Sequence, residues 1–122
     1  MVTKAMFEEV RVLRRKLLKL EAIKAAGVDS SVCMALIDQM DKDIESLWVM
    51  VSLSFEGLDY WVKKTIELYY FWALSVEQIS EYFYRGTEST GKVRKILTDF
   101  LIDLNIKNQY GLPPLYNESE SK

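Results

Sequence analysis

L74-S-V-E-Q-I-S-E-Y-F-Y-R-G-T-E-S-T-G-K-V-R-K-I-L97 is the stretch that decides the fold of this chain. Its first residues, Ser75 to Gln78, match a capping box, in which the serine hydroxyl accepts from the backbone N–H three residues on and the glutamine reaches back. We therefore expect a helix to begin at Ser75. Gly86 and the Ser/Thr residues around it interrupt that helix after about two and a half turns.

A second helix is expected after this break, beginning between Thr87 and Thr90, where any hydroxyl residue can cap it. It carries one apolar face at helical spacing, formed by Val93, Leu97, Phe100 and Leu104. Basic residues lie off that face. A short capped helix, a turn and a helix with exposed basic residues is the order of parts in a helix-turn-helix.

Two apolar stripes in the first 57 residues predict an antiparallel helical hairpin. The stripe over residues 3–26 consists of Met6, Val10, Leu13, Leu17 and Leu20, and Gly27 ends it. The stripe over residues 31–55 consists of Ile37, Met40, Ile44, Leu47 and Val51. Residues 3–26 carry seven Lys/Arg against three Asp/Glu, and residues 29–56 carry one against six, so the two helices should attract each other.

The basic run from Arg11 to Lys19 has two interpretations. It forms either a solvated, ion-paired flank of the hairpin or a phosphate-binding surface, and we favour the flank because interspersed charge on a helix usually faces water. Apolar surface left over on the hairpin, for example Trp48 and Met50, offers a place for a homodimer to form.

Aromatic residues concentrate between Phe55 and Tyr84, which hold ten of the fifteen in the chain. On a helical wheel over 58–74, one face is expected to belong to the core: Leu58, Trp61, Val62, Tyr69 and Trp72. Tyr60 and Phe71 lie toward the polar side and, with Trp48, are the candidates for contact with a partner protein. Tyr82 to Tyr84 end the short helix and are expected mostly in the core.

Composition excludes several classes of function. The 122 residues, 49% of them hydrophobic, suffice for one core. No run approaches the roughly 18 apolar residues of a membrane span, and no secretory signal precedes the first helix, so we expect a soluble cytoplasmic protein without membrane contact. Cys33 is the single cysteine and histidine is absent, which leaves no expected metal or cofactor site. Scattered carboxylates and the lack of a paired nucleophile and base argue against an enzyme.

At residues 68–97 the chain resembles region four of the bacterial sigma-70 factors and the small sigma-like regulators of phages and prophages. In that family, one helix carries the pattern leucine, any residue, tyrosine. The next helix carries glycine, leucine, serine, any residue, glutamate, glutamate or glutamine, isoleucine and alanine. The corresponding stretch of this chain is L68-Y-Y-F-W-A-L-S-V-E-Q-I-S80. Val93, Arg94 and Leu97 match the second helix. The resemblance implies a DNA-binding transcriptional regulator that also contacts RNA polymerase.

Carried over to this chain, the resemblance implies a DNA-facing set consisting of Thr87, Ser89, Thr90, Lys92, Arg94 and Lys95. The chain departs from the pattern at the turn, where the family has glycine and this sequence has Tyr84. Glu88 would repel phosphate, and the net charge of −2 means that any affinity for DNA comes from a local basic face.

These observations predict an all-α fold: an N-terminal antiparallel helical hairpin over 1–57, a three-helix helix-turn-helix module over 58–106 and an irregular tail over 107–122. The first functional hypothesis is a homodimeric regulator that reads duplex DNA with the helix starting near residue 88. The alternative is a helical protein-interaction module, an inhibitor or adaptor of RNA polymerase, a sigma factor or another host protein, without DNA-binding activity.

Overall fold

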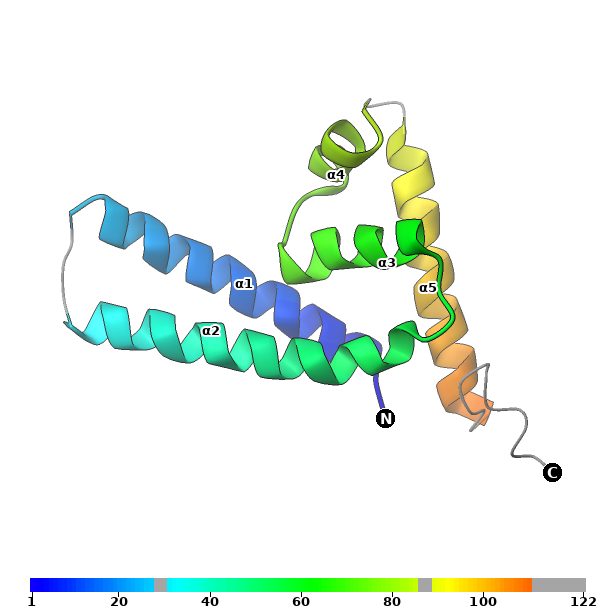
Figure 1. Cartoon of the computed structure of the whole chain (residues 1–122), viewed down its shortest axis with the longest axis horizontal. Coiled ribbons are helices and arrows are strands. Elements are labelled where there is room, and N and C mark those ends of the chain that lie inside the picture. The colour runs from blue at the N-terminus through cyan, green and yellow to red at the C-terminus, as the bar shows by residue number, and fades with distance from the viewer. Residues whose placement is uncertain (28–30, 86–88, 111–122) are drawn as a thin grey trace.

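Every regular element that the structure describes is a helix (Figure 1). The computed structural model describes residues 1–27, 31–85 and 89–110, and no β-strand occurs within these ranges. Their α-helices are α1 (Lys4–Ala25), α2 (Ser31–Val51), α3 (Tyr60–Ile66), α4 (Val76–Phe83) and α5 (Thr90–Tyr110). A 3-10 turn, η1 (Ser52–Phe55), follows α2, and a π-helical turn, η2 (Glu67–Phe71), follows α3. The expected all-α class is confirmed, and no helix in the described ranges is long and apolar enough to cross a bilayer.

Helices α1 and α2 lie side by side, run in opposite directions and project away from the other helices (Figure 1); we call this pair the arm. Val10, Leu17 and Ile44 are fully buried along it, as the two apolar stripes predict. The first stripe differs at its start, because Phe7 is fully buried whereas Met6 is only half-buried. Beyond the end of α1, Gly27 has a φ of +97°, a conformation that glycine adopts without strain.

An aromatic cluster around Phe7 joins the arm to the rest of the molecule. The Phe7 ring centroid lies 5.3 Å from that of Tyr70 and 5.3 Å from that of Phe100. Trp48 and Phe55 lie at 6.2 and 6.1 Å from it. Aromatic pairs at these separations contribute about 0.5–1.5 kcal/mol each beyond burial of their area. Side chains of α2, η1, η2 and α5 therefore pack around one side chain of α1.

The helix expected after the arm exposes part of the face that was predicted to be buried. Trp61 and Trp72 are 55% and 46% exposed, whereas Ile66 and Leu68 are buried. The helix changes from α to π geometry, and the N–H of Trp72 donates to the carbonyl of Glu67, five residues back, at 3.1 Å. This wider turn rotates the later side chains relative to a regular wheel, which places Trp72 outward. The π turn does not account for Trp61, which lies before it.

Helix α5 buries the apolar face expected from its sequence: Val93, Leu97, Phe100 and Leu104. It continues to Tyr110, four residues past the expected boundary at 106. The side-chain amide of Asn108 donates to the carbonyl of Val2 at 2.7 Å, and Lys107 forms an ion pair at 2.9 Å one turn back. These contacts hold the last turn, so the expected irregular tail does not begin at Lys107. Residues 111–122 lie outside the described residues.

Candidate nucleic-acid interface

Helix α4 follows a capping box at the position that the sequence predicts. The Ser75 hydroxyl accepts from the N–H of Gln78 at 3.0 Å, and the Gln78 side-chain oxygen accepts from the N–H of Ser75 at 2.8 Å. Both bonds satisfy backbone donors that have no partner within the helix. The prediction of the capping box is confirmed, and the box fixes where α4 starts.

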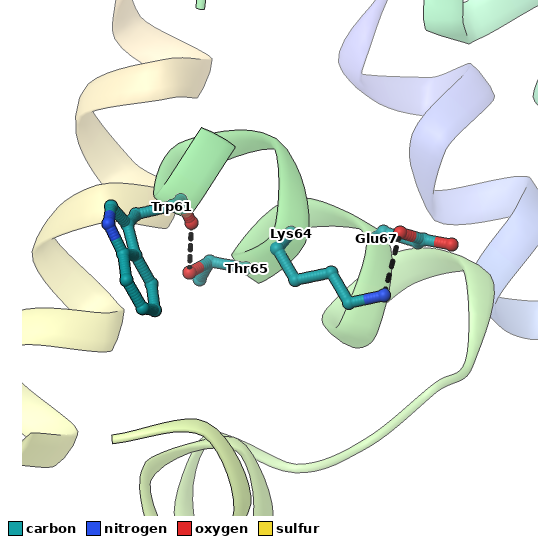
Figure 2. A network of polar contacts seen from close by, with 4 residues as sticks. All are labelled: Trp61, Lys64, Thr65 and Glu67. Carbon is teal, nitrogen blue, oxygen red and sulfur yellow. Dashed lines mark hydrogen bonds and ion pairs between the residues drawn. The ribbon is translucent and has the colours of Figure 1, made fainter. Parts of the chain in front are cut away.

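Buried side chains and a chain of hydroxyl groups hold α4 against its neighbours. Ile79 and Ser80 are fully buried where α4 packs on α5 and η2. The Thr65 hydroxyl of α3 donates to the carbonyl of Trp61 at 2.7 Å, as Figure 2 shows. The hydroxyl of Tyr84 lies 2.8 Å from the same oxygen. Because the Thr65 proton is already committed, Tyr84 donates, and the end of α4 is tied to α3.

The turn between α4 and α5 is longer than the three or four residues usual in a helix-turn-helix. Helix α4 ends at Phe83 and α5 begins at Thr90, which leaves six residues between them. Arg85 has a φ of +62°, the left-handed conformation that normally favours glycine. Ser89 and Thr90 are half-buried at the start of α5. Thr87, which was also predicted to contact DNA, lies outside the described residues.

The three predicted DNA-contacting cations lie on the first two turns of α5. Lys92, Arg94 and Lys95 are exposed, and Val93 between them is fully buried. The Nζ atom of Lys92 lies 5.0 Å from the centroid of the Tyr84 ring, a cation–π distance. The structure therefore brings these three charges to one end of α5, beside the end of α4.

Two of these cations are already paired with carboxylates. An Nη atom of Arg94 lies 3.3 Å from an Oε atom of Glu77 on α4, and the Nζ atom of Lys95 lies 2.9 Å from an Oδ atom of Asp99. All four side chains are more than half exposed, so each pair contributes only about 0–1 kcal/mol. Sequence reasoning identified both cations but missed Glu77, because it lies 17 residues away from Arg94.

Two residues of the basic run on α1, Arg11 and Arg14, fit neither of its two interpretations, whereas Arg15, Lys16 and Lys19 are exposed, as expected for a solvated flank. Arg14 is buried, and its Nε atom donates to the carbonyl of Phe71 at 2.8 Å. Arg11 is half-buried and donates from one Nη atom to the carbonyls of Tyr69 and Leu74. The Tyr69 and Phe71 carbonyls lie at the C-terminal end of η2, where helix carbonyls lack intrahelical partners, and Leu74 follows in the link to α4. The two arginines therefore act as side-chain caps for η2.

Ring contacts reinforce this capping. The guanidinium carbon of Arg11 lies 3.8 Å from the centroid of the Tyr69 ring. That of Arg14 lies 4.7 Å from the Phe71 ring and 4.9 Å from the Trp72 ring. Burial lowers the pKa of the Arg11 guanidinium from its ordinary value. The sequence showed the charges but not their partners, which lie 57 to 63 residues away.

The predicted partner contacts divide into two groups. Trp48 and Phe71 are half-buried and pack against each other with ring centroids 5.2 Å apart, so they belong largely to the core. Trp48 and Phe71 therefore have less free surface than expected, whereas Met50, the other residue expected to carry leftover apolar surface, is exposed. Tyr60 is exposed at the start of α3, with its ring 5.6 Å from that of Trp61. It remains a candidate contact.

An open apolar groove of about 850 Å³ lies between α1, η2 and α4. Leu18, Trp72 and Tyr82 are its exposed apolar members, and Lys64 and Glu81 add charge to its lining. Tyr82 was expected mostly in the core and is instead 72% exposed, in the lining of this groove. Sequence patterns did not reveal this groove.

Compared with known proteins, the chain matches no family model, no curated protein and no solved structure. Among the described residues, no group of three acidic or cysteine side chains is arranged to hold a metal ion.

Proposed function

We propose that this chain binds duplex DNA through the start of α5 and acts as a transcriptional regulator. The observation that carries the proposal is the exposure of three cations, Lys92, Arg94 and Lys95, on the first two turns of a helix that a short capped helix braces. In helix-turn-helix proteins, the N-terminal residues of the second helix enter the major groove while the first helix crosses the backbone.

Each cation has a role in this proposal. Lys92 and Lys95 contact phosphates, which set the register of the protein on the duplex without reading sequence. Arg94 reads a base edge, since a guanidinium can donate two parallel hydrogen bonds to guanine. Ser89 and Thr90 supply hydroxyl donors at the helix start. The likeness of residues 68–97 to sigma region four supports this arrangement.

The ion pairs at the site limit the affinity. Before Arg94 and Lys95 contact DNA, they must exchange Glu77 and Asp99 for phosphate or base oxygens. Exchange is inexpensive because both pairs are exposed. The acids nevertheless repel DNA, so we expect weak binding that falls steeply with salt.

A gel-shift titration at low salt tests the proposal. The double variant Lys92→Ala, Arg94→Ala should weaken binding to a mixed-sequence duplex at least tenfold. Lys42→Ala, which removes an exposed cation from α2, is the matched control and should leave binding within twofold. If the double variant binds as tightly as the wild type, the start of α5 is not the interface.

The apolar groove supports a second candidate function, an interaction module for a bacterial transcription protein such as RNA polymerase or a sigma factor. Contiguous exposed apolar surface marks protein-contact sites more often than apolar residues scattered singly over a surface do. The variant Trp72→Ala, Tyr82→Ala should abolish binding to purified RNA polymerase holoenzyme in a surface-binding assay while leaving DNA affinity unchanged. Retained polymerase binding would exclude the groove.

A further inference from the structure

An open hollow of about 300 Å³ lies where α3, the end of α4 and the start of α5 meet. We call it the aromatic hollow. Three aromatic and two basic side chains line it: Trp61, Phe83, Tyr84, Arg85 and Lys92. Of these residues, only Lys92 belongs to the proposed duplex-binding set. The volume is at the lower end of the roughly 300–1,000 Å³ found for small-molecule sites, which suits one flat ring.

The three rings of the aromatic hollow pack against one another. The ring centroids of Trp61 and Phe83 lie 4.8 Å apart, and those of Phe83 and Tyr84 lie 5.0 Å apart. Because the rings are in contact, a ligand lies on their open surface and not between them. Trp61 supplies most of that surface, since it is 55% exposed whereas the other two rings are half-buried. An exposed indole face can stack on a nucleobase.

Hydrogen bonds through Thr65 hold two walls of the aromatic hollow in place. The Thr65 hydroxyl donates to the carbonyl of Trp61 (Figure 2) and accepts from the hydroxyl of Tyr84. Thr65 is fully buried, so water does not compete for these bonds. The ring surface is therefore formed before a ligand arrives, which lowers the entropic cost of binding.

The two cations of the aromatic hollow indicate the charge of its ligand. The Nζ atom of Lys92 lies 5.0 Å from the centroid of the Tyr84 ring, and Arg85 directly follows Tyr84. Both cations are exposed, and within the described residues neither forms an ion pair, in contrast to Arg94 and Lys95. Two uncompensated positive charges repel a cationic ligand and attract an anionic one. The aromatic hollow therefore suits a flat ring attached to a negative charge.

The backbone of Arg85 adds a second reason to assign it a contact. Its φ of +62° is left-handed, directly after the last helical turn of α4, where glycine is the usual residue. Any other side chain at this position costs free energy relative to glycine. Residues in such strained conformations cluster at binding sites. The strain at Arg85 has a use if its guanidinium contacts the ligand.

We infer that the aromatic hollow binds an unpaired nucleotide of a single DNA strand. The base stacks on Trp61, and Arg85 and Lys92 contact the flanking phosphates. Such stacking tolerates every base, because each has a flat face. The choice of DNA rests on the proposed function, which brings DNA to the adjacent start of α5.

The aromatic hollow is a site apart from the proposed base-reading residue, Arg94. Residues two apart on a helix do not share a face, so Lys92 and Arg94 point in different directions. Lys92 lies over the Tyr84 ring, whereas Arg94 reaches Glu77. Loss of Trp61 should therefore affect binding of a single strand and not of a duplex.

Fluorescence anisotropy with a labelled oligo(dT) of about 15 nucleotides tests the site, since this strand cannot pair with itself. The wild type should bind it at low salt, and Trp61→Ala should weaken binding about tenfold through loss of one stacked base. Trp72→Ala is the matched control, because Trp72 is 46% exposed but lines the apolar groove instead. It should leave binding within twofold. No binding by the wild type, or equal losses in the two variants, overturns the inference.

An abasic strand of the same length separates stacking from charge, because it keeps the phosphates and lacks the bases. The wild type should bind it about as weakly as Trp61→Ala binds oligo(dT). Equal affinity of the wild type for the two strands would overturn the stacking role of Trp61. A phosphotyrosine peptide also joins a flat ring to a negative charge, and binding of that peptide without binding of oligo(dT) would overturn the assignment to a nucleotide.

Arg85→Gly tests the phosphate contact with two opposite effects. It should raise the urea midpoint, because glycine adopts the left-handed conformation without strain, and it should weaken oligo(dT) binding several-fold. A merely structural role would not produce both changes. Unchanged binding would overturn the contact assigned to Arg85.

Duplex binding is measured in parallel on the same variants. Trp61→Ala should leave the affinity for a duplex within twofold, because Trp61 lies outside the duplex-binding set. Binding of oligo(dT) without binding of a duplex would contradict the proposed function and support the aromatic hollow as a site. Binding of a duplex without binding of oligo(dT) would overturn the inference and leave the proposed function standing.

Discussion

Two clusters of basic residues on this chain look alike in sequence and differ in structure. On α1, Arg11 and Arg14 are partly or fully buried and donate to backbone carbonyls of η2. On α5, Arg94 and Lys95 are exposed and paired with carboxylates. The first cluster is fixed because its guanidinium groups are themselves half-buried or buried against the carbonyls to which they donate. The second is exchangeable, since water or a phosphate can replace each acid. The partner, and not the charge, decides whether a basic cluster is structural or available for binding.

The largest expected effect is at the buried cluster. Arg14→Leu should destabilise the protein by about 3 kcal/mol, because the Phe71 carbonyl loses its donor and the rings lose a packed guanidinium. Urea denaturation followed by circular dichroism measures this loss. Arg15→Leu, one residue along and exposed, should change stability by less than about 0.5 kcal/mol. Equal losses at both positions would remove the distinction between the two clusters.

A smaller loss of stability is expected at high pH from Tyr70, which also packs between α1 and η2. Burial raises the pKa of its hydroxyl from 10.0 to about 12. The folded state therefore keeps a proton that the unfolded state loses, so stability is full below pH 10 and falls as pH rises toward 12. The loss should reach about 2 kcal/mol. The contribution of Tyr70 is isolated by comparing the urea midpoints of the wild type and Tyr70→Phe from pH 9 to 12. If the two midpoints fall in parallel as pH rises, the predicted contribution of Tyr70 is contradicted.

A gain in stability is expected at Ala73, which ends η2. Its φ of +59° is left-handed, and the N–H of Leu74 donates to the carbonyl of Leu68 at 3.0 Å, as in a glycine-capped helix end. Ala73→Gly should therefore stabilise the protein by about 1 kcal/mol. The control is Ala35→Gly inside α2, which should destabilise it by a similar amount. A loss at both sites would show that Ala73 is not strained.

The smallest effect on stability, but an informative effect on binding, is expected at the exchangeable cluster. Glu77→Gln removes the exposed partner of Arg94 and should change stability by less than about 0.5 kcal/mol. It should raise affinity for duplex DNA several-fold, because Arg94 no longer has to leave an acid before it contacts DNA and because a negative charge is removed from the interface. Fluorescence anisotropy with a labelled duplex measures this gain. Weaker binding would mean that Glu77 orients Arg94 for contact instead of competing for it.

Local patterns were predictable from the sequence and distant partners were not. The capping box at Ser75, the stripe through Val10 and Leu17 and the buried face of α5 all depend on residues within a few turns, and each was found. The π turn was not predicted because a helical wheel assumes constant α-helical geometry. The capping role of Arg11 and Arg14 and the ion pair of Glu77 were not predicted, because their partners are distant in the sequence and come close only on folding. At the candidate site, the cations were therefore identified and their electrostatic surroundings were not.

The central claim, that the start of α5 binds duplex DNA, is tested most directly by the salt dependence of binding. Three cations on phosphates or bases predict a slope of log affinity against log salt of about −2 to −3 per chain. Lys92→Ala should reduce its magnitude by about 1. A duplex that does not bind at low salt, or a slope that Lys92→Ala and Arg94→Ala leave unchanged, would contradict the claim.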